Sequence, residues 1–379
     1  MDSPQPLAQI ESVRGVSIPA APSLVIEPNQ RLDLRPFAEV LPLLAADVEA
    51  IYGRRSRLAP VEVWERLYSY VLRAGVVHDG DAAPREHLFV KVSKFKVVDG
   101  SSSGMRARVE KDFAVTQRVF ERMADGESYG AVRPIACYPV HLAIVTEEVP
   151  GETLLDVAEH TIRWAFPSSR AAALEQVFVA AGKWIRDFQE PAAGAFDGAW
   201  TREYIDLRLQ RIASVTGRRG ERLRDHVLRH IDRLTSRLGE EPPAAVTVHA
   251  DLAPSNVMVC GNRVVVLDFA MARPGHPLQD VARLFTQLDL LALKPQYRRA
   301  VVRPLQQALL RGFDSALRAD DPGFRLQVLA QRINHLGSLS TKKYGILERT
   351  YNQFIVWQHW RWIEQETTPG RPEDAAAWG

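Results

Sequence analysis

The hydrophobic pattern divides the chain into a part rich in predicted strands and a part that is mostly helical. Apolar residues spaced three and four apart predict helices over 36–52 and 106–123. Short apolar runs bounded by turn residues predict four strands, over 66–76, 87–93, 131–138 and 141–149. We therefore expect a small α+β unit that ends at Pro150 and Gly151, a pair of residues typical of a chain break between elements.

Beyond Gly151 the pattern is helical over 153–238 and again over 280–364. A single β-like island interrupts it. Valine-rich runs separated by short polar loops predict its strands, at 246–248, 257–259 and 264–267. Polar loops held by a rigid scaffold are a common place for chemistry, so this island is the first place to look for a functional site.

These patterns predict three segments. Residues 1–35 are rich in proline, alanine and serine with weak periodicity, which indicates an N-terminal arm. Residues 36–150 form the predicted N-terminal lobe, and residues 151–379 form a helical C-terminal lobe. A chain of 379 residues is long enough for two such packed units.

Composition narrows the partners and the compartment. The net charge of +2, from 48 basic and 46 acidic residues, leaves no excess for holding a polyanion, so we expect no nucleic-acid partner. Two cysteines are too few for a disulfide framework and fit the reducing cytoplasm. The chain has no run of 18 apolar residues, and we expect no transmembrane segment. Its pattern carries no information on oligomeric state.

The strongest chemical pattern lies in the β-like island. His249 and Asp251 precede Asn256 by a short loop, and Asp268 ends the next valine-rich strand. With one substitution, this order matches the loop H-R-D-x-x-x-x-N and the D-F-G element of kinases. Phosphoryl transfer needs an acceptor for the substrate's hydroxyl proton and oxygen ligands for magnesium. Two carboxylates and an amide oxygen supply these groups, and His249 is expected to order the loop.

An ATP site also needs a cation for the α- and β-phosphates, paired with a carboxylate on a neighbouring helix. Lys91 meets this need from the predicted strand FVKVS, in which Val90 and Val92 would face the opposite side. Glu110 on the following helix is our predicted partner for Lys91, and Asp112 is the rival.

Two segments, HADLAPSNVMV and VLDFAMARPGHPLQDVARL, resemble the paired signatures of the aminoglycoside phosphotransferase and choline kinase-like family. Members of that family usually have a sequence close to HGDLHPGNVLV followed by a DF or DW strand. The similarity is specific over 247–284 and weaker at Lys91 and over 144–155. One departure is D-F-A in place of D-F-G, because Ala270 lacks the backbone freedom of glycine.

The resemblance implies an α+β, protein-kinase-like fold of two lobes, a small β-rich N-terminal one and a larger, mostly helical C-terminal one, with ATP between them. It implies that Asp251 is the catalytic base and that Asn256 and Asp268 bind Mg²⁺. Lys91 would bind the phosphates, and adenine would rest on the linker from Glu147 to Val149. Asp280 would match the family's acidic residue after the D-F strand, in a supporting role.

The predicted function is transfer of the γ-phosphoryl group of ATP to a hydroxyl of a small molecule, with a sugar or glycan intermediate preferred as acceptor. The alternative is a catalytically inactive kinase-like module that binds a nucleotide or a partner. The aromatic segment 344–364 is expected to pack in the core. A wall of the substrate site, or a peripheral contact with a membrane surface, is the alternative for that segment.

Overall fold

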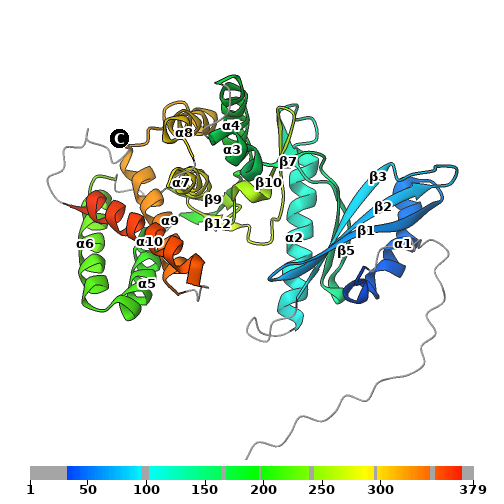
Figure 1. Cartoon of the computed structure of the whole chain (residues 1–379), viewed down its shortest axis with the longest axis horizontal. Coiled ribbons are helices and arrows are strands. Elements are labelled where there is room, and N and C mark those ends of the chain that lie inside the picture. The colour runs from blue at the N-terminus through cyan, green and yellow to red at the C-terminus, as the bar shows by residue number, and fades with distance from the viewer. Residues whose placement is uncertain are drawn as a thin grey trace, which may run out of the picture. The chain divides into compact units, whose positions relative to one another are not determined.

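The computed structural model (Figure 1) describes most of the chain in seven stretches. These are residues 32–94, 102–163, 168–195, 198–238, 243–293, 297–341 and 346–368. The predicted N-terminal arm lies outside the described residues except for its last few positions. Within the described stretches, no helix combines the length and the apolar character that crossing a membrane requires.

The described residues form two compact units. Those within Met1–Arg106 and Ile135–Glu148 make up the first unit, and those within Ala107–Pro134 and Val149–Gly379 make up the second. We predicted one continuous lobe over 36–150. The first unit ends two residues short of that boundary, at Glu148, and residues 107–134 group with the second unit instead.

The first unit is a five-stranded sheet with one helix packed on it. Its strands, in spatial order β1-β2-β3-β6-β5, are Ser56–Glu65, Ser69–His78, Glu86–Ser93, Ala143–Glu147 and Pro134–Tyr138. A short 3₁₀ turn, Arg35–Phe37, precedes helix α1, Val40–Tyr52. The apolar face of α1, including Leu41, Leu44 and Val48, forms a core with Leu88 and Val90 of β3. Burial of these side chains is what holds the helix against the sheet.

Strand β1 was missed by the sequence pattern, which began the first strand at residue 66. Residues Arg66, Leu67 and Tyr68 are instead the tip of the β1–β2 hairpin, and Leu67 is 72% exposed. Pro60 lies inside β1, where the register shifts between Pro60 and Glu62. A proline is tolerated on an edge strand because its missing N–H need not pair, and β1 is the edge of this sheet.

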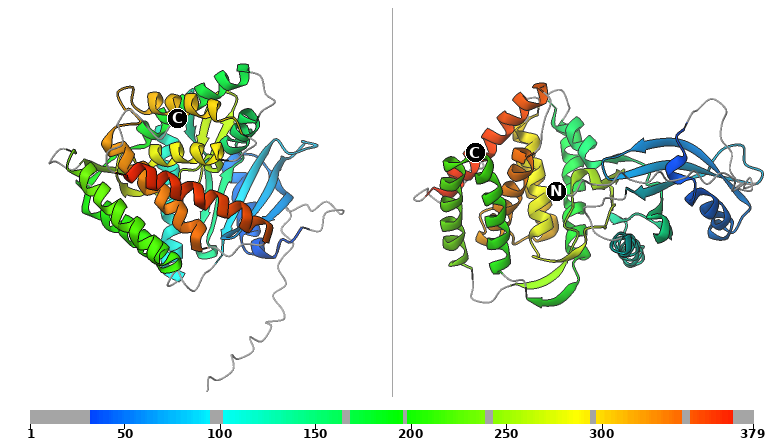
Figure 2. Two further views of the ribbon diagram at one scale, coloured as in Figure 1. Left: turned by 60° about the vertical axis from the view of Figure 1, so that its left-hand side comes forward. Right: turned by 90° about the horizontal axis from the view of Figure 1, so that it is seen from below.

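The second unit is mostly helical. Helix α2, Ser102–Arg122, spans the boundary between the two residue sets, and the remaining helices follow in chain order. They are α3 Leu154–Ile162, α4 Ser168–Phe188, α5 Gly198–Thr216, α6 Arg218–Thr235, α7 Gln279–Ala292, α8 Arg299–Phe313, α9 Pro322–Thr341 and α10 Ile346–Thr367. Helices α5 and α6 lie side by side, as Figure 2 shows. The predicted helical stretches are confirmed in position.

Two small sheets in the second unit carry the β-like island. One has the order β4-β11-β10-β7, formed by Tyr129–Ala131, Arg263–Val266, Val257–Cys260 and Glu152–Thr153. The other has the order β12-β9-β8, formed by Arg273–Gly275, Ala244–Val248 and Pro191–Ala195. Strands β10 and β11 form an antiparallel hairpin from Val257↔Val266 to Cys260↔Arg263. The three predicted valine strands are therefore present, and they bring their polar ends together.

Gly151, directly before β7, is under a strict backbone constraint. Its φ is +135°, and a Cβ at this position would lie 2.2 Å from the carbonyl oxygen of Val259. Gly261, in the β10–β11 turn, has φ +61°, and a Cβ there would meet no atom within 4 Å. Of the two, only Gly151 combines an unusual φ with the close approach of another strand.

We expect Gly151→Ala to lower the free energy of unfolding by about 3 kcal/mol, because backbone strain and a steric clash add. Gly261→Ala is the matched control and should cost about 1–2 kcal/mol, the strain of the left-handed conformation alone. Urea denaturation followed by tryptophan fluorescence measures both. Equal losses in the two variants would contradict the close approach of β7 to β10.

Candidate active site

The predicted catalytic loop follows β9 and leads into the β10–β11 hairpin. His249, Ala250 and Asp251 come directly after β9, and a 3₁₀ turn, Pro254–Asn256, leads into β10. The Leu267 N–H donates to the Asn256 carbonyl at 2.9 Å, which brings the end of β11 beside the loop. Asp268 follows Leu267 with φ +63°, so the chain turns sharply there. The fold thus gathers all three predicted oxygen donors in one neighbourhood.

His249 orders this neighbourhood from within the core. Its ring Nε2 donates to the Leu267 carbonyl at 3.0 Å, and its Nδ1 accepts the Asp251 N–H at 3.3 Å. These two partners require the tautomer that carries its proton on Nε2. The ring is 0% exposed, and its centroid lies 5.1 Å from that of the Phe269 ring. The supporting role predicted for His249 agrees with these contacts.

Asp280 holds the backbone of the same loop. Its Oδ2 accepts the His249 N–H at 2.6 Å and its Oδ1 accepts the Ala250 N–H at 3.0 Å. The side chain is 0% exposed. Burial raises the pKa of Asp280, while the nearby His249 and the two backbone N–H groups oppose that shift. Asp280 lies in the first turn of α7, where the helix dipole favours a carboxylate.

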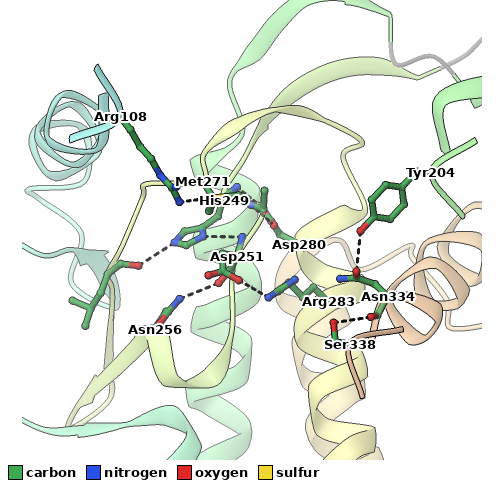
Figure 3. Close-up of polar contacts among 12 residues, drawn as sticks. Arg108, Tyr204, His249, Asp251, Asn256, Met271, Asp280, Arg283, Asn334 and Ser338 are labelled. Atoms are coloured by element: carbon green, nitrogen blue, oxygen red, sulfur yellow. Dashed lines mark hydrogen bonds and ion pairs between the residues drawn. The ribbon is translucent and has the colours of Figure 1, made fainter. Parts of the chain in front are cut away.

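The Asp251 carboxylate is half-exposed and has a cationic partner. Its Oδ1 accepts a hydrogen bond from Nη2 of Arg283 at 2.5 Å, and the two side chains are 46% and 20% exposed. Figure 3 shows the guanidinium reaching the carboxylate from α7. Sequence reasoning missed Arg283. The signal that could have found it is its position three residues after Asp280, on the same helix face.

Asn256 and Asp268 form a donor set that fits Mg²⁺. The Asn256 Nδ2 donates to the Asp251 carbonyl at 3.0 Å (Figure 3), which fixes the orientation of the amide and leaves Oδ1 as its acceptor atom. An amide oxygen and a carboxylate are hard oxygen ligands of the kind that Mg²⁺ prefers. Among the described residues, no cluster of three or more His, Cys, Asp or Glu side chains suits a metal. The donor set is thus incomplete without oxygen atoms from phosphate or water, as is usual for Mg²⁺.

Lys91 lies in β3 of the first unit, between Val71 of β2 and Ile144 of β6 in the register. Leu88 and Val90 point to the face that α1 covers. Because side chains alternate along a strand, Lys91 points to the opposite face, as predicted. That face also carries Arg73, the cross-strand neighbour of Phe89. The Arg73 guanidinium forms an ion pair with the Glu148 carboxylate at 2.8 Å.

The two candidate carboxylates of α2 differ in burial. Glu110 is exposed, whereas Asp112 is 6% exposed and shares the buried face with Val109 and Thr116. The choice between them as the partner of Lys91 stays a prediction. Glu147, the last residue of β6, pairs with Leu88 of β3 in the register, and the Glu148 N–H donates to the His87 carbonyl at 2.7 Å.

The family comparison places these residues in context. The phosphotransferase enzyme family matches residues 116–329, which is more than half of the chain. The chain belongs to the phosphotransferase enzyme family. Asp251, Asn256, Asp268 and Asp280 all lie inside the matched stretch. A comparison with curated protein sequences finds no match to this phosphotransferase.

Solved structures share the fold of this phosphotransferase. Amicoumacin kinase hAmiN, in complex with AMP-PNP, Ca²⁺ and Ami, has a TM-score of 0.51 and 13% identity, covering 82% of this chain and 90% of that chain. A choline/ethanolamine kinase family protein from Mesorhizobium loti has a TM-score of 0.51 and 16% identity, with coverage of 86% and 94%. The streptomycin–ATP–APH(2″)-IIa ternary complex has a TM-score of 0.50 and 12% identity, with coverage of 83% and 95%.

These matches confirm three predictions from the sequence. The family is the expected one, the fold is the protein-kinase-like α+β fold with a β-rich N-terminal part and a mostly helical C-terminal part, and the chain is a phosphotransferase. The roles of individual residues in the predicted site are not tested by the matches and stay predictions.

The turn that leads from β12 into α7 contains a histidine that must stay neutral. Nδ1 of His276 accepts the Leu278 N–H at 3.0 Å, which shapes the chain just before Asp280. Burial lowers the pKa of His276 to about 4, although the Asp321 carboxylate acts in the opposite direction. A histidine in an unfolded chain has a pKa of about 6.5.

We expect this phosphotransferase to lose stability as the pH falls from about 6.5 to about 4, because the unfolded chain takes up a proton that folded His276 does not. The contribution of His276 is up to about 3 kcal/mol over that window. His276→Asn should flatten the pH dependence by this amount, since its amide oxygen can still accept the Leu278 N–H. Urea unfolding at a series of pH values measures the slope. His226, exposed on α6, is the control position, and an equal effect of His226→Asn would contradict the assignment.

Proposed function

We propose that this phosphotransferase moves the γ-phosphoryl group of ATP to a hydroxyl of a small molecule, with Asp251 as the catalytic base. The observation that carries the proposal is the state of the Asp251 carboxylate. Its backbone is fixed through His249 and Asn256, while its side chain remains 46% exposed. A carboxylate that is held in place but accessible can accept a hydrogen bond from an acceptor hydroxyl and orient it for attack.

Asn256 and Asp268 bind Mg²⁺ in this proposal. Mg²⁺ supplies positive charge that offsets the negative charge of the phosphates during transfer. The residues of the chain set the geometry: the Asn256 amide is oriented by the Asp251 carbonyl, and Asp268 is directed by the positive φ that follows β11. Both supports are backbone features of the same loop system, so metal binding and positioning of the base depend on one piece of structure.

Residues of the first unit and the linker bind the nucleotide in this proposal. Lys91 contacts the α- and β-phosphates, and backbone groups from Glu147 to Val149 hold the adenine. We predicted Glu110 as the carboxylate partner of Lys91. Asp112 remains the rival for that role.

The acceptor is a hydroxyl-bearing small molecule, and we retain a sugar or glycan intermediate as the preferred class. The helical part contains a set of neutral polar groups of the kind that can bind hydroxyls. The Tyr204 hydroxyl donates to Oδ1 of Asn334, and the Ser338 hydroxyl donates to its carbonyl, each at 3.0 Å (Figure 3). Phe354 and Trp357 of α10 are 41% and 46% exposed and offer aromatic surface. Tyr344, at the N-terminal end of the aromatic segment, and Lys342 just before it lie outside the described residues.

The alternative is a kinase-like module that binds nucleotide without turnover. A thermal-shift titration with ATP and Mg²⁺, followed by an ADP-release screen over a panel of hydroxyl compounds, separates the two functions. Stabilisation by ATP without ADP release from any compound would favour the module. We place the protein in the cytoplasm, a proposal supported by its two cysteines, which are too few for a disulfide framework.

We expect Asp251→Asn to lower the rate of ADP release by about 100- to 10,000-fold, the usual contribution of a positioned base. The dissociation constant for Mg²⁺–ATP should change by no more than about twofold, because the amide keeps the volume of the side chain. Asp320→Asn, at an exposed position outside the loop, is the control and should leave both quantities unchanged. Wild-type turnover of Asp251→Asn would remove Asp251 from the mechanism.

We expect Lys91→Met to weaken ATP binding by about 10- to 100-fold, because a charge-assisted hydrogen bond to phosphate is worth about 1.5–3 kcal/mol. Lys94→Met is a matched control close by in the sequence. The Lys94 amine is held by Glu65 at 2.7 Å and lies over the Tyr70 ring, so its loss should affect stability more than affinity. Isothermal titration with ATP and Mg²⁺ measures both variants. Equal affinities for the two would argue against phosphate binding by Lys91.

A further inference from the structure

The N-terminal part of α7 contacts three consecutive residues of the catalytic loop. Asp280 accepts the backbone N–H groups of His249 and Ala250 at 2.6 and 3.0 Å. Arg283, one turn along the same face of the helix, donates to the carboxylate of Asp251 at 2.5 Å (Figure 3). A single helical turn therefore fixes both the backbone of the loop and the side chain proposed as the base.

The loop needs such support because its backbone is strained. Ala250 has φ +62°, a conformation that costs a residue with a Cβ about 1–2 kcal/mol relative to the right-handed region. Strain of this kind persists only where the surroundings determine it. The bond from the Ala250 N–H to buried Asp280 is one such determinant, and it orients the peptide that joins His249 to Ala250.

The contact between Arg283 and Asp251 has the geometry of a positioning interaction. One guanidinium nitrogen, Nη2, meets one carboxylate oxygen, Oδ1, so Arg283 does not enclose the carboxylate as a bidentate pair would. The arginine side chain is 20% exposed, whereas the carboxylate is 46% exposed. The less exposed partner thus fixes the direction of the more exposed one.

The chemistry of phosphoryl transfer fits a base held by a cation. The transition state is loose in most descriptions, with little proton transfer needed from the attacking hydroxyl, so catalysis depends more on orientation than on basicity. A neighbouring guanidinium fixes the position of the carboxylate that accepts its hydrogen bond. For this reaction, orientation of that kind is what the base requires.

We propose that Arg283 is a positioning residue of the phosphotransferase, which acts by holding the Asp251 carboxylate toward the acceptor hydroxyl. The inference rests on the proposed role of Asp251 as base. Arg283 contacts the reacting groups only through Asp251, so its effect on the rate must disappear when Asp251 no longer acts as a base.

A double-mutant cycle tests this dependence, with ADP release from Mg²⁺–ATP in the absence of added acceptor as the assay and water as the phosphoryl acceptor. We expect Arg283→Met to lower kcat by about 10- to 100-fold with the KM for ATP changed by no more than about twofold, as for loss of orientation alone. Arg283→Lys should recover part of that loss, because lysine keeps one charged donor but not the planar guanidinium. The double variant Asp251→Asn/Arg283→Met should be no slower than Asp251→Asn alone.

Controls separate positioning from folding. Gln287→Met, in the same helix and away from the loop, should leave kcat unchanged. Thermal unfolding of the ATP-free protein supplies a second readout: the losses in midpoint caused by Arg283→Met and Asp251→Asn should be non-additive, because both remove the same contact. A variant that fails to fold appears in this measurement, and Arg283→Lys then serves in the cycle in place of Arg283→Met.

The outcomes distinguish the inference from the function on which it rests. Wild-type turnover of Asp251→Asn overturns the proposed base and the inference together. A slow Asp251→Asn with wild-type kcat in Arg283→Met overturns the inference alone. Multiplicative losses in the double variant also overturn it, because Arg283 would then act on nucleotide or acceptor independently of Asp251.

Discussion

The candidate active site depends on one buried carboxylate. Asp280 accepts two consecutive backbone N–H groups, those of His249 and Ala250, and its own side chain is 0% exposed. Leaving these donors unpaired in the core would cost about 1–3 kcal/mol each. Burial raises the pKa of Asp280, so the carboxylate is costly to keep ionised, and the bonds from the loop are what make it acceptable there. Helix α7 and the catalytic loop therefore stabilise each other.

Aromatic packing keeps this interaction away from water. The rings of Trp184 and Phe188 stack with centroids 4.8 Å apart, and both lie close to the His249 ring. Phe269, which follows Asp268, completes the apolar surroundings at 5.7 Å from Phe188. Core residues therefore lie directly beside the proposed metal-binding and catalytic groups. This arrangement gives polar side chains at a surface the rigidity of the interior, which a phosphotransferase needs because its catalysis is largely a matter of orientation.

The polar groups of the site form two sets: the proposed functional groups, which are held in position, and the groups that hold them. Asp251 and Asn256 present their functional atoms while the Asn256 amide is bonded to the backbone of Asp251. Asp280 and Arg283 are less exposed and hold the loop from helix α7. A conservative change in the second group can therefore alter activity without touching substrate. The same division explains why a strained residue, Ala250, is retained inside the loop.

The order of most elements could be predicted from the sequence, because it depends on periodicity, and the family could be predicted from the resemblance of two short motifs. The short spacing from Asp251 to Asn256 likewise predicts that these two residues lie in one loop. Strand β1 could not be predicted, since Pro60 and the charged residues around it obscure the alternation of an edge strand. Which face of α2 is buried was equally out of reach, because it depends on packing. The contact of Arg283 with Asp251 became visible only in the folded chain. Arg283 shares a helix face with Asp280, but its separation of 32 residues from Asp251 leaves no local pattern that joins the two, and the contact exists because α7 packs against the loop.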